Sequence, residues 1–175
     1  MRKQRNKNRV NQTGRNQTTR FARLDHALLN SCAYRALTPT ARALLVELVM
    51  LENGSNNGSL YLSIRDAADR IGVADLTAVR KAFDELQGLG FAAMTEESHF
   101  HVKAAEKSRA RCWRLTWLAG PGRKGPTMDY TTCQPEPGAK AHKRMERGMR
   151  ALKSFRKARD SGRLPVLDSD TVGQD

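Results

Sequence analysis

The stretch that decides the fold is LSIRDAADRIGV at residues 62–73, followed by DLTAVRKAFDEL at residues 75–86. Ser63 and Asp75 each stand directly before a helical pattern, and their side-chain oxygens can accept the free N–H groups of a first helical turn. Gly72 allows the left-handed backbone that ends a helix and reverses the chain. The sequence therefore predicts two helices joined by a tight turn, at 64–71 and 76–87.

The second of these helices has an apolar face and a polar face. Leu76, Val79, Phe83 and Leu86 recur at helical spacing, which predicts that their face is buried. Two small residues of the first helix, at 67–68, let the second helix cross it closely. This geometry is typical of a helix-turn-helix, in which the second helix enters the major groove of DNA. The residues left free for that groove are Thr77, Ala78, Arg80, Lys81 and Asp84.

Further helical and strand patterns lie on both sides of this pair. Thr38 and Pro39 open a helix that ends near Asn53-Gly54. A first helical piece is expected at about 24–35, and strands are expected at 60–62, 91–94, 100–102 and 111–117, with the turn of a hairpin at 104–110. This order of elements predicts a mainly α fold with a small β-hairpin (α+β), a winged helix-turn-helix.

The charge of the chain is unevenly distributed. Its 175 residues include 31 Lys+Arg and 18 Asp+Glu, which gives a formal net charge of +13 and a pI of about 10.3. Residues 1–20 carry +7, residues 21–118 carry +1, residues 119–163 carry +8 and residues 164–175 carry −3. A nearly neutral domain between two basic segments favours a polyanionic partner, because cations placed on phosphates release condensed counterions.

The same distribution divides the chain into five parts. They are a disordered basic arm at 1–20, a winged helix-turn-helix DNA-binding domain at 21–118, an irregular linker at 119–138, a basic amphipathic helix at 139–163 and a disordered acidic tail at 164–175. Met145, Met149 and Leu152 form a narrow apolar stripe on the basic helix. This stripe would either join two copies in a homodimer or fold back on the domain.

Composition and motifs argue against several protein classes. The mean hydropathy is −0.64, and no apolar run approaches the roughly 20 residues of a membrane span. The basic first residues have no apolar stretch behind them, so no secretory signal is expected. Three widely spaced cysteines fit a reduced, cytoplasmic protein, and DNA binding would make it nucleoid-associated. His99 and His101, with Cys112, are too few for a zinc site, which normally has four ligands. Without a phosphate-binding glycine loop or a catalytic triad pattern, we expect no enzyme, no cofactor and no metal.

A set of short motifs is spread over about residues 21–135. They are Leu37-Thr38, 41–45, Asn53-Gly54, 56–58, Leu60, Leu62-Ser63, Ala67-Ala68, Gly72, Glu85-Leu86, Gly90-Phe91, 113–116 and Asp129-Tyr130. On these residues the chain resembles small winged-helix proteins of bacterial chromosomes, plasmids and phages, which are distantly similar to the N-terminal winged helix of plasmid replication initiators. The resemblance implies a winged-helix fold and DNA binding, without fixing an operator sequence.

These observations predict a sequence-specific protein that binds double-stranded DNA, most simply a transcriptional regulator. Helix 76–87 would read the major groove, while the hairpin at 91–117 and the basic segments would contact the backbone or the minor groove. A replication or partition accessory protein is an alternative, and an RNA- or ribosome-associated basic protein is another. Trp113 could stack on bases, but its alternation with charged neighbours favours the core. The candidate DNA-binding residues are Ser63, Arg65, Thr77, Ala78, Arg80, Lys81 and Asp84 in the helices, Lys103, Lys107, Arg109 and Arg111 in the hairpin, Arg2, Lys3, Arg5, Lys7, Arg9, Arg15 and Arg20 in the arm, and Lys143, Arg144, Arg147 and Arg150 in the basic helix.

Overall fold

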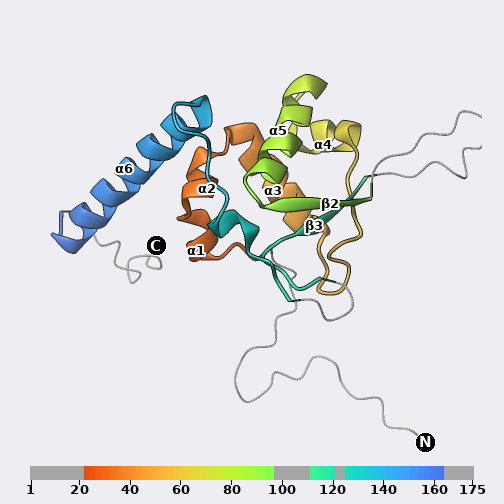
Figure 1. Ribbon diagram of the computed structural model, residues 1–175, viewed down its shortest axis with the longest axis horizontal. Coiled ribbons are helices and arrows are strands. Elements are labelled where there is room, and N and C mark those ends of the chain that lie inside the picture. Colours follow the sequence, from red (N-terminus) through yellow and green to blue (C-terminus); the bar gives the residue numbers. More distant parts are fainter. Residues whose placement is uncertain (1–21, 97–110, 121–124, 164–175) are drawn as a thin grey trace, which may run out of the picture.

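The computed structural model describes residues 22–96, 111–120 and 125–163 (Figure 1). Within them the chain is mixed α and β, with six α-helices, a short 3-10 helix and a three-stranded antiparallel sheet. The elements are α1 (His26–Leu29), α2 (Cys32–Ala36), α3 (Pro39–Leu51), β1 (Leu60–Tyr61), α4 (Ile64–Ile71), α5 (Leu76–Gly88), β2 (Ala92–Glu96), β3 (Cys112–Leu115), η3 (Asp129–Thr131) and α6 (Lys140–Asp160).

The three central helices begin at their predicted caps. The Thr38 hydroxyl accepts the Ala41 N–H at the start of α3, and the Ser63 hydroxyl accepts the Asp66 N–H at the start of α4. The Asp75 carboxylate does the same for α5, where it accepts the Thr77 N–H at 2.8 Å. Gly72 ends α4 with a φ of 67°, a backbone conformation that favours glycine. Local cap chemistry therefore sets these boundaries, and α5 runs one residue beyond the predicted end.

The predicted helix over 24–35 is wrong as a single element. The structure has two short helices there, because the Ser31 hydroxyl accepts the Tyr34 N–H and starts α2 afresh. That cap holds Ser31 in an extended conformation, with φ −70° and ψ 153°, which interrupts the helical path after α1.

The strands form a sheet in the order β1-β3-β2. Leu60 pairs with Trp113, and Ala92 pairs with Leu115. The predicted strand over 111–117 is shorter in the structure, because the chain turns after Leu115, whose carbonyl accepts the Leu118 N–H at 3.4 Å. The predicted strand at 100–102 and the turn at 104–110 lie outside the described residues.

Aromatic rings join the helices to the sheet. Phe83 of α5 stacks on Trp113 of β3 with ring centroids 4.6 Å apart, and both side chains are fully buried. The prediction that Trp113 belongs to the core is therefore confirmed. Leu76 was expected on the same buried face, but its side chain is 41% exposed. It is the first residue of α5 and lies beyond the end of the core, whereas Ala82 is buried in mid-helix.

The described part of the segment 119–138 is more than an irregular linker. Tyr130 in η3 is buried, and its ring stacks on Phe91 with centroids 5.4 Å apart. Gly90 makes room for this packing, since a Cβ there would lie 2.6 Å from the Asp129 carbonyl carbon. The segment therefore contributes to the core, and α6 follows it as the predicted basic helix.

In Figure 1, α6 lies beside α2, at the opposite side of the view from α4. Met145 is half-buried where α6 meets the core. Gly148 permits a close approach, because a Cβ at that position would lie 3.0 Å from the Cβ of Arg35. Met145 thus folds back on the domain, and Met149 and Leu152 of the stripe are half-buried, whereas Phe155, beyond the stripe, is 54% exposed.

Candidate nucleic-acid interface

The outward face of α5 carries the residues that the sequence predicts for base contacts. Thr77, Arg80, Lys81 and Asp84 are exposed there, and Ala78 is half-buried at the edge. The opposite face is fixed in the core by the buried residues Val79, Ala82, Phe83 and Leu86. A rigidly packed helix thus presents a short polar surface of one threonine, two cations and one carboxylate.

The two predicted residues at the start of α4 have different surroundings. Arg65 is exposed. Ser63 is half-buried, and its hydroxyl both accepts the Asp66 N–H at 3.1 Å and donates to the Asp66 carboxylate at 2.6 Å. The cap of α4 therefore occupies this hydroxyl. Farther along α4, the Arg70 guanidinium lies 3.4 Å from the Glu47 carboxylate of α3.

The charges of α4 and α5 balance. The two helices carry four cations, Arg65, Arg70, Arg80 and Lys81, and four carboxylates, Asp66, Asp69, Asp84 and Glu85. Asp75, the N-cap of α5, adds a fifth carboxylate. A balanced surface has little long-range attraction for a polyanion, because opposite charges cancel beyond about one Debye length, roughly 8 Å at physiological salt. The net positive charge of the described residues must come from elsewhere.

Most of it lies on α6. This helix carries Lys140, Lys143, Arg144, Arg147, Arg150, Lys153, Arg156, Lys157 and Arg159, against two acids, Glu146 and Asp160. Among the predicted contacts, Lys143, Arg147 and Arg150 are exposed, and Arg144 is half-buried. The helix therefore offers a cationic surface about 30 Å long at 1.5 Å per residue.

The other predicted contact residues are mostly not described. In the hairpin, Arg111 is half-buried directly before β3, whereas Lys103, Lys107 and Arg109 lie outside the described residues. The arm residues Arg2, Lys3, Arg5, Lys7, Arg9, Arg15 and Arg20 also lie outside them.

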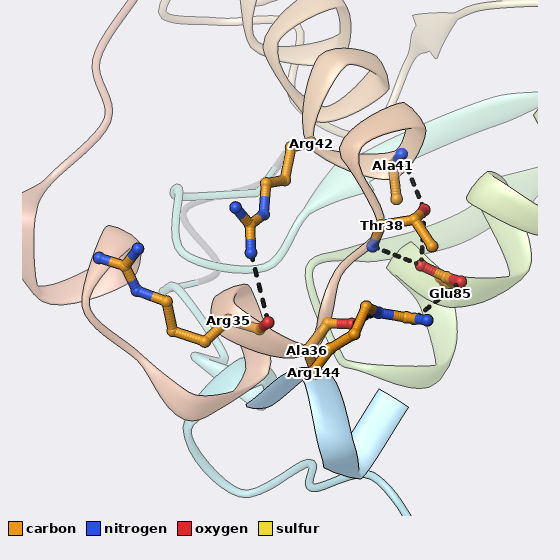
Figure 2. Close-up of polar contacts among 7 residues, drawn as sticks. All are labelled: Arg35, Ala36, Thr38, Ala41, Arg42, Glu85 and Arg144. Carbon is orange, nitrogen blue, oxygen red and sulfur yellow. Dashed lines mark hydrogen bonds and ion pairs between the residues drawn. The ribbon is translucent and has the colours of Figure 1, made fainter. Parts of the chain in front are cut away.

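A polar cluster that the sequence did not predict joins α5 to α3 and α6 (Figure 2). One carboxylate oxygen of Glu85 accepts the Thr38 backbone N–H at 2.9 Å and the Thr38 hydroxyl at 3.0 Å. Its other oxygen accepts a guanidinium N–H of Arg144 at 3.2 Å, while Arg144 Nε donates to the Ala36 carbonyl at 2.8 Å. Because Glu85 and Arg144 are 59 residues apart, no short-range pattern announces the pair. Arg144, predicted to contact DNA, is thus engaged within the protein.

A second unpredicted contact holds the loop before β1 against β3. Asn57 is buried, and its amide nitrogen donates to the Leu115, Leu118 and Ala119 carbonyls at 2.9, 3.1 and 3.0 Å. Its amide oxygen accepts the Leu115 N–H at 2.7 Å. The side chain therefore takes the place of backbone pairing where β3 ends.

The cysteines are free thiols, and all three are half-buried. Burial raises the pKa of the Cys112 thiol, and the nearby Glu96 carboxylate raises it further by charge and by a hydrogen bond. This thiol stays protonated near neutral pH. The described residues contain no group of three or more side chains able to hold a metal ion, and His99 and His101 lie outside them.

Two further findings concern membrane spans and known proteins. Each helix in the described part of the chain is too short or too polar to cross a bilayer. Comparison with protein-family models, with curated proteins and with solved structures finds no match in any of the three.

Proposed function

We propose that this protein is a winged helix-turn-helix that binds double-stranded DNA sequence-specifically and acts as a transcriptional regulator. In this proposal α5 reads the major groove, and α6 with the basic arm contacts backbone phosphates. The observation that carries the proposal is the arrangement of α3, β1, α4, α5, β2 and β3 around one core, with the sheet in the order β1-β3-β2.

This arrangement suits DNA reading for a physical reason. A helix reads bases when one face is locked in a core and the other is free to enter the groove, which is about 12 Å wide. The core side of α5 is buried from Val79 to Leu86, and its outer side exposes Arg80 and Lys81. Arginine and lysine bond the acceptor edge of guanine, and threonine contacts either a base or a phosphate.

Because their charges balance, α4 and α5 would contribute to the sequence specificity of DNA binding more than to its affinity. Contacts with phosphates supply most non-specific binding, and they need an excess of cations. That excess lies on α6 and in residues 1–20. Hence we expect base readout and phosphate binding to be separable by substitution.

The test compares two double substitutions that remove the same charge. Arg80→Ala with Lys81→Ala should weaken binding to the preferred duplex by about 1–3 kcal/mol for each residue that reads a base. Arg156→Ala with Lys157→Ala, on exposed positions of α6, is the matched control. It should weaken binding to preferred and random duplexes by a similar factor.

The preferred duplex is first selected from a random pool with the full chain. Affinities of both variants are then measured on that duplex and on random sequence by fluorescence anisotropy. If the α5 variant keeps the parent's ratio of specific to random affinity, α5 is not the reading helix.

A second candidate follows from the concentration of cations on α6. An RNA-binding protein would rely on such a helix and would use α4 and α5 as a scaffold. Titrations with duplex DNA, duplex RNA and single strands of the same sequence separate the two. Tighter binding to RNA, unaffected by substitution of Arg80 and Lys81, would favour this candidate.

A further inference from the structure

A groove of about 630 Å³ lies between α6 and the segment that runs from α1 to the start of α3. Along α6, its lining changes from cationic at Arg147 to apolar at Ala151, Leu152 and Phe155. Arg35 and Arg42 line it from the other side. The groove is therefore cationic at one end and apolar at the other.

Its arginines are short of negative partners. The Arg35 guanidinium donates to the Asn30 amide oxygen, and the Arg42 guanidinium donates to the Arg35 carbonyl, both at 3.3 Å (Figure 2 shows the second bond). These acceptors are neutral. Within the described residues, neither arginine forms an ion pair, and neither does Arg147. Arg144 differs, because it pairs with Glu85.

Two of these cations are also crowded together. The Arg42 and Arg35 guanidinium carbons lie 4.9 and 5.9 Å from the centre of the same Tyr34 ring. The Nε atom of each is buried and has no hydrogen-bond partner in the described part of the chain. Unpaired cations in a partly desolvated groove attract carboxylates more strongly than cations surrounded by water do.

One segment of the chain has the complementary chemistry. Residues 164–170 read LPVLDSD, four apolar residues followed by two aspartates within three positions. These residues lie outside the described ranges. Whether they can bind in the groove therefore depends on their sequence and on the distance that seven residues can span. The stretch 164–175 contains acids and no base.

We propose that the groove binds residues 164–170 of the same chain. The apolar residues pack on Phe155 and Leu152, and Asp168 and Asp170 reach the unpaired arginines. The chemistry of the segment follows the lining of the groove in order, because a chain that runs back along α6 from Arg163 meets the apolar end first.

The reach is sufficient. After α6, the Arg163 N–H bonds the Ala158 carbonyl at 3.0 Å, and Gly162 has a φ of 66°, which turns the chain out of the helix. Helix α6 ends at Asp160, and from there back to Arg147 is 13 helical residues, or roughly 20 Å. Seven extended residues span about the same distance, which places Asp170 level with Arg147.

Because residues 164–170 are covalently attached to the end of α6, weak contacts are enough to hold them in the groove. A segment that follows α6 directly is present at an effective concentration in the millimolar range for a short flexible linker. Bound there, Asp168 and Asp170 would neutralise cations that would otherwise be free for phosphates. That consequence rests on the proposed function, whereas the docking itself does not.

The test uses the full chain labelled with nitrogen-15 and follows NMR signals of the groove. The reporters are the Gly148 amide and the Nε–H groups of Arg35 and Arg42. Asp168→Asn with Asp170→Asn should shift these signals and should accelerate exchange of the two Nε–H groups with solvent severalfold. Asp175→Asn, a like change farther along the chain, is the control and should leave them in place. A Leu167→Ser variant should also shift the Gly148 signal, because the apolar half of the contact is weakened.

Each other outcome overturns the proposal. Unchanged signals in the double variant mean that the segment does not occupy the groove. Equal shifts in the double variant and in Asp175→Asn mean a diffuse charge effect. Shifts that vanish on dilution mean that the tail of a second copy binds there. If inorganic phosphate moves the signals of the parent as far as those of the double variant, the groove is an open anion site.

Discussion

Phe83→Ala removes the ring that joins the helices to the sheet. The ring is fully buried and stacks on Trp113 with a centroid distance of 4.6 Å and an interplanar angle of 12°. A buried Phe→Ala change costs about 3–5 kcal/mol, the sum of lost transfer free energy and the cavity left behind. Loss of the stacked pair accounts for roughly 0.5–1.5 kcal/mol of that. Since whole domains are stable by about 5–15 kcal/mol, we expect a folded but weakened protein.

The control is Met50→Ala, which truncates a large apolar side chain that is 58% exposed on α3. It should change the free energy of unfolding by less than about 0.5 kcal/mol. Urea unfolding followed by far-UV circular dichroism measures both, and it avoids the fluorescence of Trp113, which the substitution itself perturbs. For a domain of this size, roughly 2–4 °C of melting temperature corresponds to 1 kcal/mol, so Phe83→Ala should melt about 6–20 °C lower.

Equal unfolding midpoints for the two variants would refute the packing of α5 on β3. A lower midpoint with a much smaller m-value would instead mean that the variant has lost two-state behaviour.

Three further predictions concern the packing of Gly90, the Glu85–Arg144 pair and the basic arm. Gly90→Ala should destabilise the protein by about 2 kcal/mol or more in thermal melts, because its φ is 73° and the new Cβ would lie 2.6 Å from the Asp129 backbone. Gly88→Ala is the control, and it should be neutral or slightly stabilising because the space around Gly88 is open. Arg144→Gln should cost about 1–2 kcal/mol, a modest value because both partners of the ion pair are partly exposed. Arg150→Gln, at an exposed position of the same helix, should cost less than about 0.5 kcal/mol, and equal urea midpoints would contradict a role for the pair. Removing residues 1–20 should make the log–log salt dependence of duplex binding shallower by about 0.9 for each phosphate that the arm neutralises, and an unchanged slope would leave the arm without a part in binding.

Local chemistry made the central helices predictable. Ser63, Gly72 and Asp75 define α4 and the start of α5 by interactions within four residues, so a single sequence contains the information. The buried face of α5 was predicted from spacing and failed at Leu76. Periodicity assigns a face to a residue, but it does not tell where the core ends.

Contacts between distant segments were not predictable. Tyr130 and Asn57 look like ordinary linker and loop residues, and they become core residues because of where Phe91 and β3 lie. The Glu85–Arg144 pair needs both the length of the segment 119–138 and the direction of α6. In the candidate site, the spacing of the apolar residues was enough to predict which side chains of α5 are exposed. The ion pair of Arg144 with Glu85 could be seen only once the fold was known.

The position of Glu85 has a consequence for how the two halves of the candidate interface work together. Glu85 belongs to α5, yet its carboxylate bonds α3 through Thr38 and α6 through Arg144. A carboxylate on a helix that approaches DNA would normally repel phosphates, so pairing it inward removes an unfavourable charge from the proposed interface. The same Arg144 side chain ties α6, which carries most of the cations of the described residues, to α5 through Glu85 and to α2 through the Ala36 carbonyl. If α5 reads DNA as proposed, this one partly buried ion pair both reduces repulsion at α5 and links α6, the proposed phosphate-binding helix, to it.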